Sequence, residues 1–276
     1  MKANLPKSGF CWEDEFVFKQ VSVIILTQME NKKSIAMRKV RPGGLKVTVV
    51  VPTYNEEAII GRTVRNLKQI LPAGTEIIVA EGYSKDYTAL IARKLKAHVV
   101  LEKEHTVGGA RNAGATAAKG ADIVWFVDAD TFPTVDFYNR MLAVFEDDPK
   151  VVGVGCHIMP EDIGILRQVF FYFLNMFVYF TVRSGKPNIA GSCVAYRKKA
   201  FEAIGGFDTE THSAEDMDLT KRIAKHGKVV FLYHVVVPTS DRRVHKLGLW
   251  GLIKDWTKTT VWYLQGKKTA SYGAYR

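Results

Sequence analysis

Short apolar runs rich in β-branched residues alternate with segments of helical period between residues 45 and 127 of this 276-residue chain. A continuous apolar run predicts a buried strand, whereas apolar residues three and four apart predict a helix. The expected strands are Leu45–Val51, Glu76–Ala80, His98–Leu101 and Ile123–Val127, and the expected helices are Glu56–Leu71, Thr88–Leu95 and Gly109–Lys119. This alternation predicts βαβ units, and hence an α/β fold with a Rossmann-like, mostly parallel sheet flanked by helices.

The rest of the chain divides into a continuation of this domain and two flanking segments. We expect a helix over Phe137–Phe145, a strand over Val151–His157, a helix over Lys199–Ile204 and a further helix that ends near Gly227. The expected organisation is an N-terminal extension over 1–44, an α/β domain over 45–243 and an amphipathic, basic C-terminal helical tail over 244–276. The sequence assigns no role to the N-terminal extension.

Composition narrows the class of partners and the compartment. The chain carries 39 lysines and arginines against 28 aspartates and glutamates, a net charge of +11, which favours nucleic acid, anionic lipid or phosphorylated small molecules. Its three cysteines are too scattered for a disulfide framework or a C-x-x-C zinc site, and the N-terminus has no signal-peptide pattern. A reducing cytoplasm is expected.

Polar loops follow the expected strands, at the sheet edge where parallel α/β folds bind ligands. In an extended chain Asp128 and Asp130, directly after Ile123–Val127, point to the same side. Two carboxylates so placed repel each other unless a cation lies between them, which favours Mg²⁺ or Mn²⁺. Arg111, in the first turn of a glycine-bounded helix, suits a phosphate. Taken singly, each loop is also consistent with ordinary turn chemistry.

The motifs and their order resemble family 2 glycosyltransferases of the GT-A fold. The resemblance spans about residues 47–243 and is carried by five segments: Val51–Glu57, Glu81–Thr88, Gly109–Gly114, Asp128–Asp130 and Ala214–Leu219. It implies an inverting, metal-dependent enzyme that moves a sugar from a nucleotide-diphosphate sugar to an acceptor. The cofactor would be Mn²⁺ or Mg²⁺, and no nucleic-acid partner is expected.

The resemblance also implies roles for individual residues. Asp216 would be the catalytic base, with Glu215 orienting the acceptor, and Asp130 would be the principal metal ligand, assisted by Asp128. At the nucleotide we expect Pro52, Tyr54, Glu56, Glu81, Arg111 and Asp128, and at the diphosphate or acceptor Gly191, Ser192, Arg242 and Arg243. From the residues alone, Glu215 and Asp216 are better explained as acids that cap a helix N-terminus, and the metal pair and nucleotide loops elsewhere in the chain reverse that preference.

Two features of the sequence leave alternatives open at the metal and the donor. Glu81 stands where the family usually has an aspartate, and Tyr83 and Tyr87 stand where small residues are common, so uracil and guanine both remain open as the base. A histidine sometimes completes such a metal site, and His212, His234 and His245 are equal candidates.

Two apolar stretches bear on the acceptor and the location. Gly164–Gly185 is rich in aromatic residues but is too interrupted for a spanning helix, which needs about 20 apolar residues, so an interfacial helix is one reading. His245–Lys268 combines tryptophans with lysines at helical spacing, which suits either an anionic membrane or packing on protein. We expect a peripheral protein on the inner face of the cell membrane, with a glycan or lipid-linked acceptor.

Two other functions are compatible with parts of the sequence. A sugar-phosphate nucleotidyltransferase also places carboxylates at a strand end, but it would normally have a Gly-rich basic loop after the first strand, and Pro52–Glu56 is not such a loop. A non-catalytic nucleotide-binding or membrane-associated scaffold protein would use the net charge alone and would not need Asp216.

Overall fold

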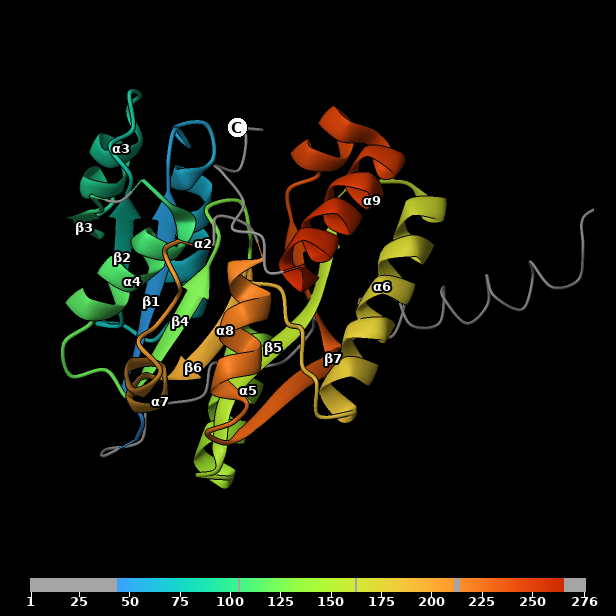
Figure 1. Cartoon of the computed structure of the whole chain (residues 1–276). Coiled ribbons are helices and arrows are strands. Elements are labelled where there is room, and N and C mark those ends of the chain that lie inside the picture. The colour runs from blue at the N-terminus through green and yellow to red at the C-terminus, as the bar shows by residue number, and fades with distance from the viewer. Residues whose placement is uncertain (1–43, 104, 162, 211–213, 266–276) are drawn as a thin grey trace, which may run out of the picture. The chain divides into compact units, whose positions relative to one another are not determined.

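One mixed sheet forms the centre of the described chain, with helices on both of its faces (Figure 1). The computed structural model describes residues 44–265 apart from 104, 162 and 211–213, so most of the expected N-terminal extension and the end of the tail lie outside the described residues. The strands are β1 Val47–Thr53, β2 Glu76–Glu81, β3 His98–Leu101, β4 Ile123–Val127, β5 Val151–Pro160, β6 Cys193–Arg197 and β7 Lys228–Thr239. The helices are α2 Ile60–Ile70, α3 Thr88–Lys94, α4 Val107–Ala117, α5 Val135–Asp147, α6 Ile165–Arg183, α7 Lys198–Ala203, α8 Glu215–Ile223 and α9 Arg242–Leu264.

The strand order is β3-β2-β1-β4-β6-β5-β7, which confirms the expected mostly parallel sheet and adds one reversal. β1, β2, β3 and β4 pair in parallel, as β5 and β7 do, whereas β6 is antiparallel to both of its neighbours. β7 is not among the strands expected from the sequence, although the run Val229–Val237 is largely apolar and β-branched. This strand matters because it ends beside the carboxylates that follow β4.

β4 is held from both faces of the sheet because its alternate residues point in opposite directions. Trp125 packs on Phe137 of α5, with ring centroids 5.3 Å apart, in the core that α2, α3 and α5 cover. Phe126 faces the opposite core, where its ring lies 5.3 Å from those of Phe201 and Phe207. Trp125 and Phe126 are fully buried, so the strand that delivers Asp128 and Asp130 is rigidly fixed.

The helix expected from Glu56 begins at Ile60 instead, because its first residues are bonded elsewhere. The Glu56 N–H donates to Thr88 Oγ1 at 2.8 Å, and the Glu57 N–H donates to the Asp86 carboxylate at 3.1 Å. These bonds to the neighbouring βα unit hold the segment as a loop at the sheet edge.

The C-terminal helix α9 is present and packs beside α6 (Figure 1). Val244 and Leu252 of α9 are buried against α6, and the Trp256 ring lies edge-on to Phe171 with centroids 6.0 Å apart. Gly248, at φ 65°, breaks the regular helix. Within the described residues, no helix combines the length and apolarity that crossing a bilayer requires.

Candidate active site

The loops after β1 and β2 are tied together by hydrogen bonds. The Asn55 N–H donates to Ser84 Oγ at 2.8 Å, and the Asn55 side-chain oxygen accepts from the Lys85 N–H at 2.9 Å. The Tyr87 N–H donates to the Glu57 carboxylate at 3.0 Å. Both loops therefore form one structure at the carboxyl edge of the sheet, where ligands bind in such folds.

Four of the residues expected at the nucleotide, Pro52, Tyr54, Glu56 and Glu81, lie in these strands and loops. Pro52 is buried within β1, and Tyr54 is half-buried just beyond the strand. The Glu81 side chain is buried, and its carboxylate accepts from the N–H groups of Tyr83, at 3.1 Å, and Ser84. Glu81 thus braces its own loop, which holds Tyr83 at φ 61° with its ring partly exposed.

Asp128 and Asp130 follow β4 in a loop that is held through its backbone. Thr63 Oγ1 of α2 donates to the carbonyl of Ala129, and the Ser240 N–H, just beyond β7, donates to the carbonyl of Asp130 at 2.8 Å. Because carbonyl groups carry these bonds, both carboxylates stay available for other contacts at the end of β4.

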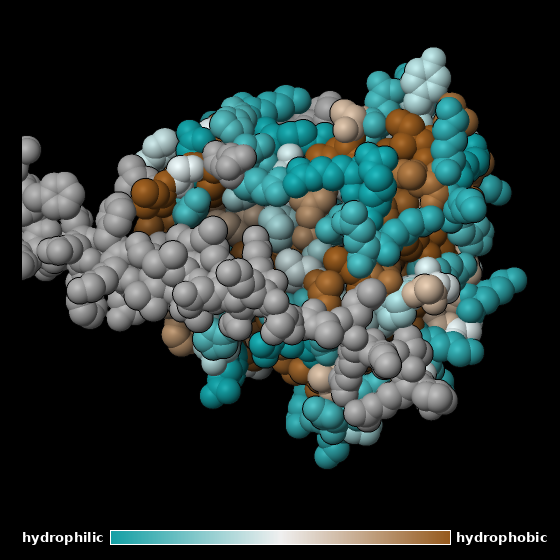
Figure 2. Space-filling view, turned by 180° about the vertical axis from the view of Figure 1, so that it is seen from behind, coloured by the Kyte–Doolittle hydropathy of each residue, from teal (hydrophilic) through white to brown (hydrophobic). Residues whose placement is uncertain are grey.

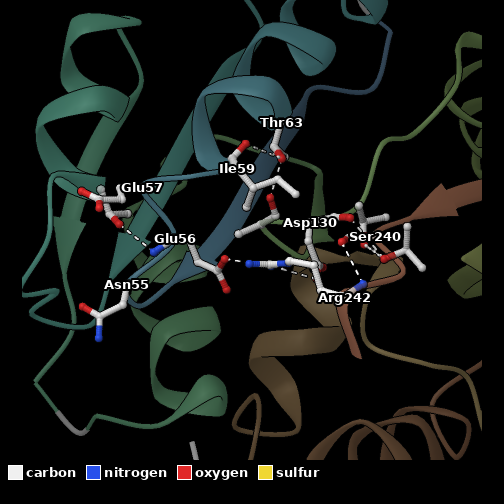
Figure 3. A network of polar contacts seen from close by, with 12 residues as sticks. Asn55, Glu56, Glu57, Ile59, Thr63, Asp130, Ser240 and Arg242 are labelled. Carbon is white, nitrogen blue, oxygen red and sulfur yellow. Dashed lines mark hydrogen bonds and ion pairs between the residues drawn. The ribbon is translucent and has the colours of Figure 1, made fainter. Parts of the chain in front are cut away.

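Arg242, at the start of α9, lies between Glu56 and Asp130 (Figure 3). Its Nη2 atom is 2.9 Å from Glu56 Oε2 and 3.2 Å from Asp130 Oδ2. Burial and the charge of Asp128 raise the pKa of Asp130, and the Arg242 guanidinium opposes that rise. A side-chain cation from the last helix therefore sits where the sequence predicts a metal ion.

Arg111 of α4 connects three segments of the site from a fully buried position. Its guanidinium is 2.9 Å from Asp128 Oδ1 and 3.0 Å from Glu215 Oε1, and it donates to the Gly191 carbonyl at 3.3 Å. Burial disfavours its charge, but the carboxylates of Asp128, Glu215 and Asp216 more than compensate, so the pKa of Arg111 is raised. A Cβ on Gly191 would lie 2.9 Å from this guanidinium, so the contact requires glycine there.

Asp216 lies in the first turn of α8, where its carboxylate bridges two backbone groups. Oδ2 accepts from the Gly191 N–H at 2.9 Å, and Oδ1 accepts from the Met217 N–H at 2.8 Å. The preceding Ala214 is left-handed, at φ 66°, a strained conformation of a kind often found at functional sites. Burial and the charge of Asp216 raise the pKa of Glu215 to about 7, against the opposing effect of Arg111.

Not all of the remaining expected residues contact the carboxylates of the site. Ser192 contributes its carbonyl, which accepts from the Asp128 N–H at 2.9 Å. Arg243 turns away from the carboxylates and pairs with Asp255 of α9 at 2.9 Å. His245 pairs with Asp241 at 2.9 Å, whereas His212 lies outside the described residues.

Three residues that support the site are absent from the sequence-based set. Thr63 and Ser240 hold the loop between Asp128 and Asp130, as described above. Asn112 clamps the turn before α8 by donating to the Phe207 carbonyl and accepting from the Phe207 N–H, both at 2.9 Å. Only Asn112 carries a sequence signal, because it follows Arg111 within the glycine-bounded motif.

The donor set at the end of β4 fits a hard divalent cation that is shared with a substrate. No cluster of three or more histidine, cysteine or acidic side chains within the described residues is arranged to hold a metal by itself. Mg²⁺ and Mn²⁺ are commonly bound by one or two carboxylates together with substrate phosphates. Asp128 and Asp130 match that pattern, and Arg242 beside Asp130 shows that a positive charge is accommodated there.

The sheet order and the cluster of carboxylates at its edge define an α/β protein of the GT-A fold. The family model for glycosyl transferase family 2 matches residues 48–205, more than half of the chain. The chain therefore belongs to glycosyltransferase family 2, as the ordered motifs predict.

Curated relatives are similar over most of this chain. The O-antigen chain rhamnosyltransferase RfbN of Salmonella typhimurium is 26% identical over 70% of this chain, and the pre-mycofactocin glycosyltransferase of Mycobacterium tuberculosis is 27% identical over 80%. The chain spans 66% and 47% of the lengths of these two proteins.

Solved structures share the fold at low identity. The mannosyltransferase PcManGT of Pyrobaculum calidifontis, solved with GDP-Man and Mn²⁺, has a TM-score of 0.58 and 22% identity, over 86% of this chain and 71% of that one. Glucosyl-3-phosphoglycerate synthase of Mycobacterium tuberculosis, solved with Mn²⁺ and UDP, has a TM-score of 0.53 and 18% identity, over 86% and 90%.

Proposed function

We propose that this chain transfers a sugar from a UDP- or GDP-sugar to a hydroxyl or phosphate acceptor, with inversion at the anomeric carbon. The observation that carries the proposal is a continuous line of polar contacts. Arg111 joins Asp128, on the donor side, to Glu215 and to Gly191, whose N–H binds Asp216. A carboxylate suited to a metal and a carboxylate suited to a base are thereby held in one rigid frame.

Inversion requires the acceptor oxygen to attack the face of the sugar opposite the leaving diphosphate. In the proposed step Asp216 accepts the hydroxyl proton while the new carbon–oxygen bond forms and the bond to the diphosphate breaks. The Gly191 N–H orients the Asp216 carboxylate, and Glu215 positions Arg111. The buried Arg111 charge opposes the rise in the pKa of Glu215 that burial and Asp216 cause.

Asp130 and Asp128 are the proposed ligands of Mn²⁺ or Mg²⁺. Such an ion supplies positive charge that stabilises the departing nucleoside diphosphate. Arg242 is proposed to contribute a second positive charge to the diphosphate, because its guanidinium already lies between Glu56 and Asp130. The position of Arg243 beside Asp255 favours a structural role for that residue instead.

Pro52, Tyr54, Glu56 and Glu81 are proposed to shape the pocket for the base and ribose. The Tyr54 ring is available for stacking, whereas the Glu81 carboxylate is engaged by its own loop and would act through the shape of that loop. The two solved neighbours described above hold UDP and GDP-Man, so both bases stay within the proposal.

The acceptor is proposed to be a glycan precursor or a lipid-linked molecule, reached from the inner face of the cell membrane. The support is the net charge of +11, which attracts the chain to anionic lipid. Peripheral contact with that surface would bring the site to a lipid-linked hydroxyl or phosphate.

The test measures nucleoside diphosphate release from a panel of UDP- and GDP-sugars, with and without Mn²⁺. Asp130→Ala and Asp216→Asn should each lower the rate by about 100-fold or more, because they remove a metal ligand and a general base. Asp218→Asn is the matched control, since Asp218 lies on the same helix and pairs with Arg222 at 2.6 Å. Equal release by the wild type and both site variants would refute the proposal.

A further inference from the structure

The helix α6 presents apolar side chains to the solvent along its middle. Phe173, Phe177 and Phe180 are 52%, 61% and 58% exposed, and their spacing of four and three residues places them on one face. A surface helix normally turns its polar residues outward and its apolar residues toward the core. We call these three side chains the phenylalanine face of α6.

α6 is apolar toward the core as well as toward the solvent, and its central polar residue points inward. Asn175 is buried, and its side chain accepts from the Ile158 N–H and donates to the Ile158 carbonyl, both at 3.0 Å. It also donates to the Phe171 carbonyl at 2.7 Å. The buried amide fixes the rotation of α6 on β5, so the outward direction of the phenylalanine face is built into the fold.

The C-terminal helix α9 does not present a similar exposed apolar face, although its sequence suggests an amphipathic membrane contact. Val244, Leu252 and Trp256 of α9 pack against α6 and leave its phenylalanine face uncovered. Trp250, at 82% exposure, is the largest exposed apolar side chain of the described part of α9.

The charged side chains of α6 itself are all positive. No aspartate or glutamate occurs from residue 163 to residue 201, whereas Arg167 and Arg183 lie near the two ends of α6. Beyond the C-terminal end is a hollow of about 240 Å³, lined in part by Lys186, Lys221 and Lys225. An apolar strip between cations matches the interfacial zone of an anionic bilayer, where acyl chains lie beneath negative headgroups.

A second copy of this chain is a poorer occupant of the same face. If two copies packed their α6 helices together across a twofold axis, the arginines of one copy, Arg167 and Arg183, would lie near the arginines of the other. Neither helix has an acidic residue to balance these charges. An anionic membrane supplies the missing negative charge.

We propose that α6 is the membrane-docking element, that its phenylalanine face enters the interface of an anionic bilayer, and that the lysine-lined hollow receives phospholipid headgroups. This inference deepens the proposed function by locating its membrane contact, and it rests on that function only for the existence of a membrane acceptor. It predicts vesicle binding in the absence of donor and acceptor.

The experiment is flotation of the full-length chain with vesicles of phosphatidylcholine, alone or mixed with phosphatidylglycerol. The wild type should float with the anionic vesicles only, and Phe177→Ser/Phe180→Ser should weaken binding by about tenfold or more. Leu90→Ser and Leu101→Ser are matched controls, because these side chains are 45% and 48% exposed on α3 and β3. Trp250→Ser tests the competing surface on α9.

A second variant tests the proposal if the phenylalanine variant does not fold. Lys186→Gln/Lys221→Gln/Lys225→Gln should weaken anionic-vesicle binding severalfold and should leave diphosphate release from a soluble donor unchanged. The proposal would be overturned if only Trp250→Ser lost binding, or if the folded phenylalanine and lysine variants bound vesicles as the wild type does. Light scattering that shows a dimeric wild type and a monomeric phenylalanine variant would also overturn it. Normal diphosphate release without vesicle binding would overturn the docking inference but not the proposed transfer.

Discussion

At the scale of single residues, two arginines of the chain itself partly neutralise the carboxylates of the site. Arg111 is buried between Asp128 and Glu215, and Arg242 holds Asp130 and Glu56 from the side of α9 (Figure 3). The two arginines differ in accessibility, because the Arg242 side chain is 47% exposed whereas that of Arg111 is 3% exposed. Arg111 is thus a fixed part of the frame, and Arg242 is able to exchange partners.

Arg242→Ala should tighten Mn²⁺ binding in the absence of nucleotide while lowering the rate of diphosphate release. The guanidinium competes with a cation for Asp130, and removing a partly exposed charge at this distance is worth about 1 kcal/mol, or about fivefold in affinity. Titration of free Mn²⁺ by electron paramagnetic resonance measures the affinity independently of turnover.

Arg243→Ala is the matched control for this prediction, since the neighbouring guanidinium pairs with Asp255 instead of a site carboxylate. Its Mn²⁺ affinity should equal that of the wild type. If Arg242→Ala weakens Mn²⁺ binding, Arg242 does not compete with the cation and the interpretation is wrong.

At the scale of elements, the position of Arg111 depends on how closely α4 approaches β1. A Cβ added at Gly114 would lie 2.2 Å from Val50 Cγ1, and Val50 is a fully buried, branched residue of β1. Glycine at this position lets the helix lie directly on the strand, which sets the height at which Arg111 meets Asp128.

Gly114→Ala should lower the free energy of unfolding by about 1 to 3 kcal/mol, because overpacking outweighs the gain in helix propensity of about 1 kcal/mol. Gly61→Ala in α2 is the control, since its Cβ would meet the mobile end of Arg65 at 3.3 Å and should be neutral or stabilising. Urea unfolding of both variants makes the comparison. A stable Gly114→Ala protein would show that α4 and β1 separate easily.

At the scale of the whole molecule, the described surface is polar over much of one face (Figure 2), and a polar side chain buried in the interior makes the stability of the fold depend on pH. On the face shown in Figure 2, hydrophilic side chains cover much of the described surface, with hydrophobic patches between them. Inside, His157 of β5 is 3% exposed among the rings of Tyr172 and Tyr233, and its Nε2 has no hydrogen-bond partner among the described residues. Burial lowers the pKa of His157 from 6.5 to about 4, against a small opposing effect of the Tyr233 backbone.

The shifted pKa of His157 predicts a loss of stability in acid. Between pH 6.5 and 4 the unfolded chain binds a proton at this position and the folded chain does not, so stability falls as the pH falls, by at most about 3 kcal/mol. His157→Phe and His157→Gln should both flatten this part of the profile, whatever their effect at pH 7.5. Urea unfolding across the range measures it, and an unchanged slope in both variants would contradict the assignment.

The sequence by itself determined the α/β class, the family and most of the strands and helices, because these follow from local periodicity and from motifs that are contiguous in the chain. It also selected Asp128, Asp130, Arg111, Glu215 and Asp216, which the structure brings into one frame or its immediate surroundings. These residues carry local signals: two carboxylates after an apolar run, an arginine among glycines and acids at a helix start.

Only the tertiary structure decided which side chains meet across long separations. Arg242 is 112 residues from Asp130, Asn112 is 95 residues from Phe207, and neither pairing leaves a local pattern. The same holds for the direction of each helix face. Asn175 interrupts the apolar run of α6 in sequence, yet its bonds to Ile158 turn the phenylalanines outward. Periodicity reports which residues share a face, whereas packing against the rest of the fold decides where that face points.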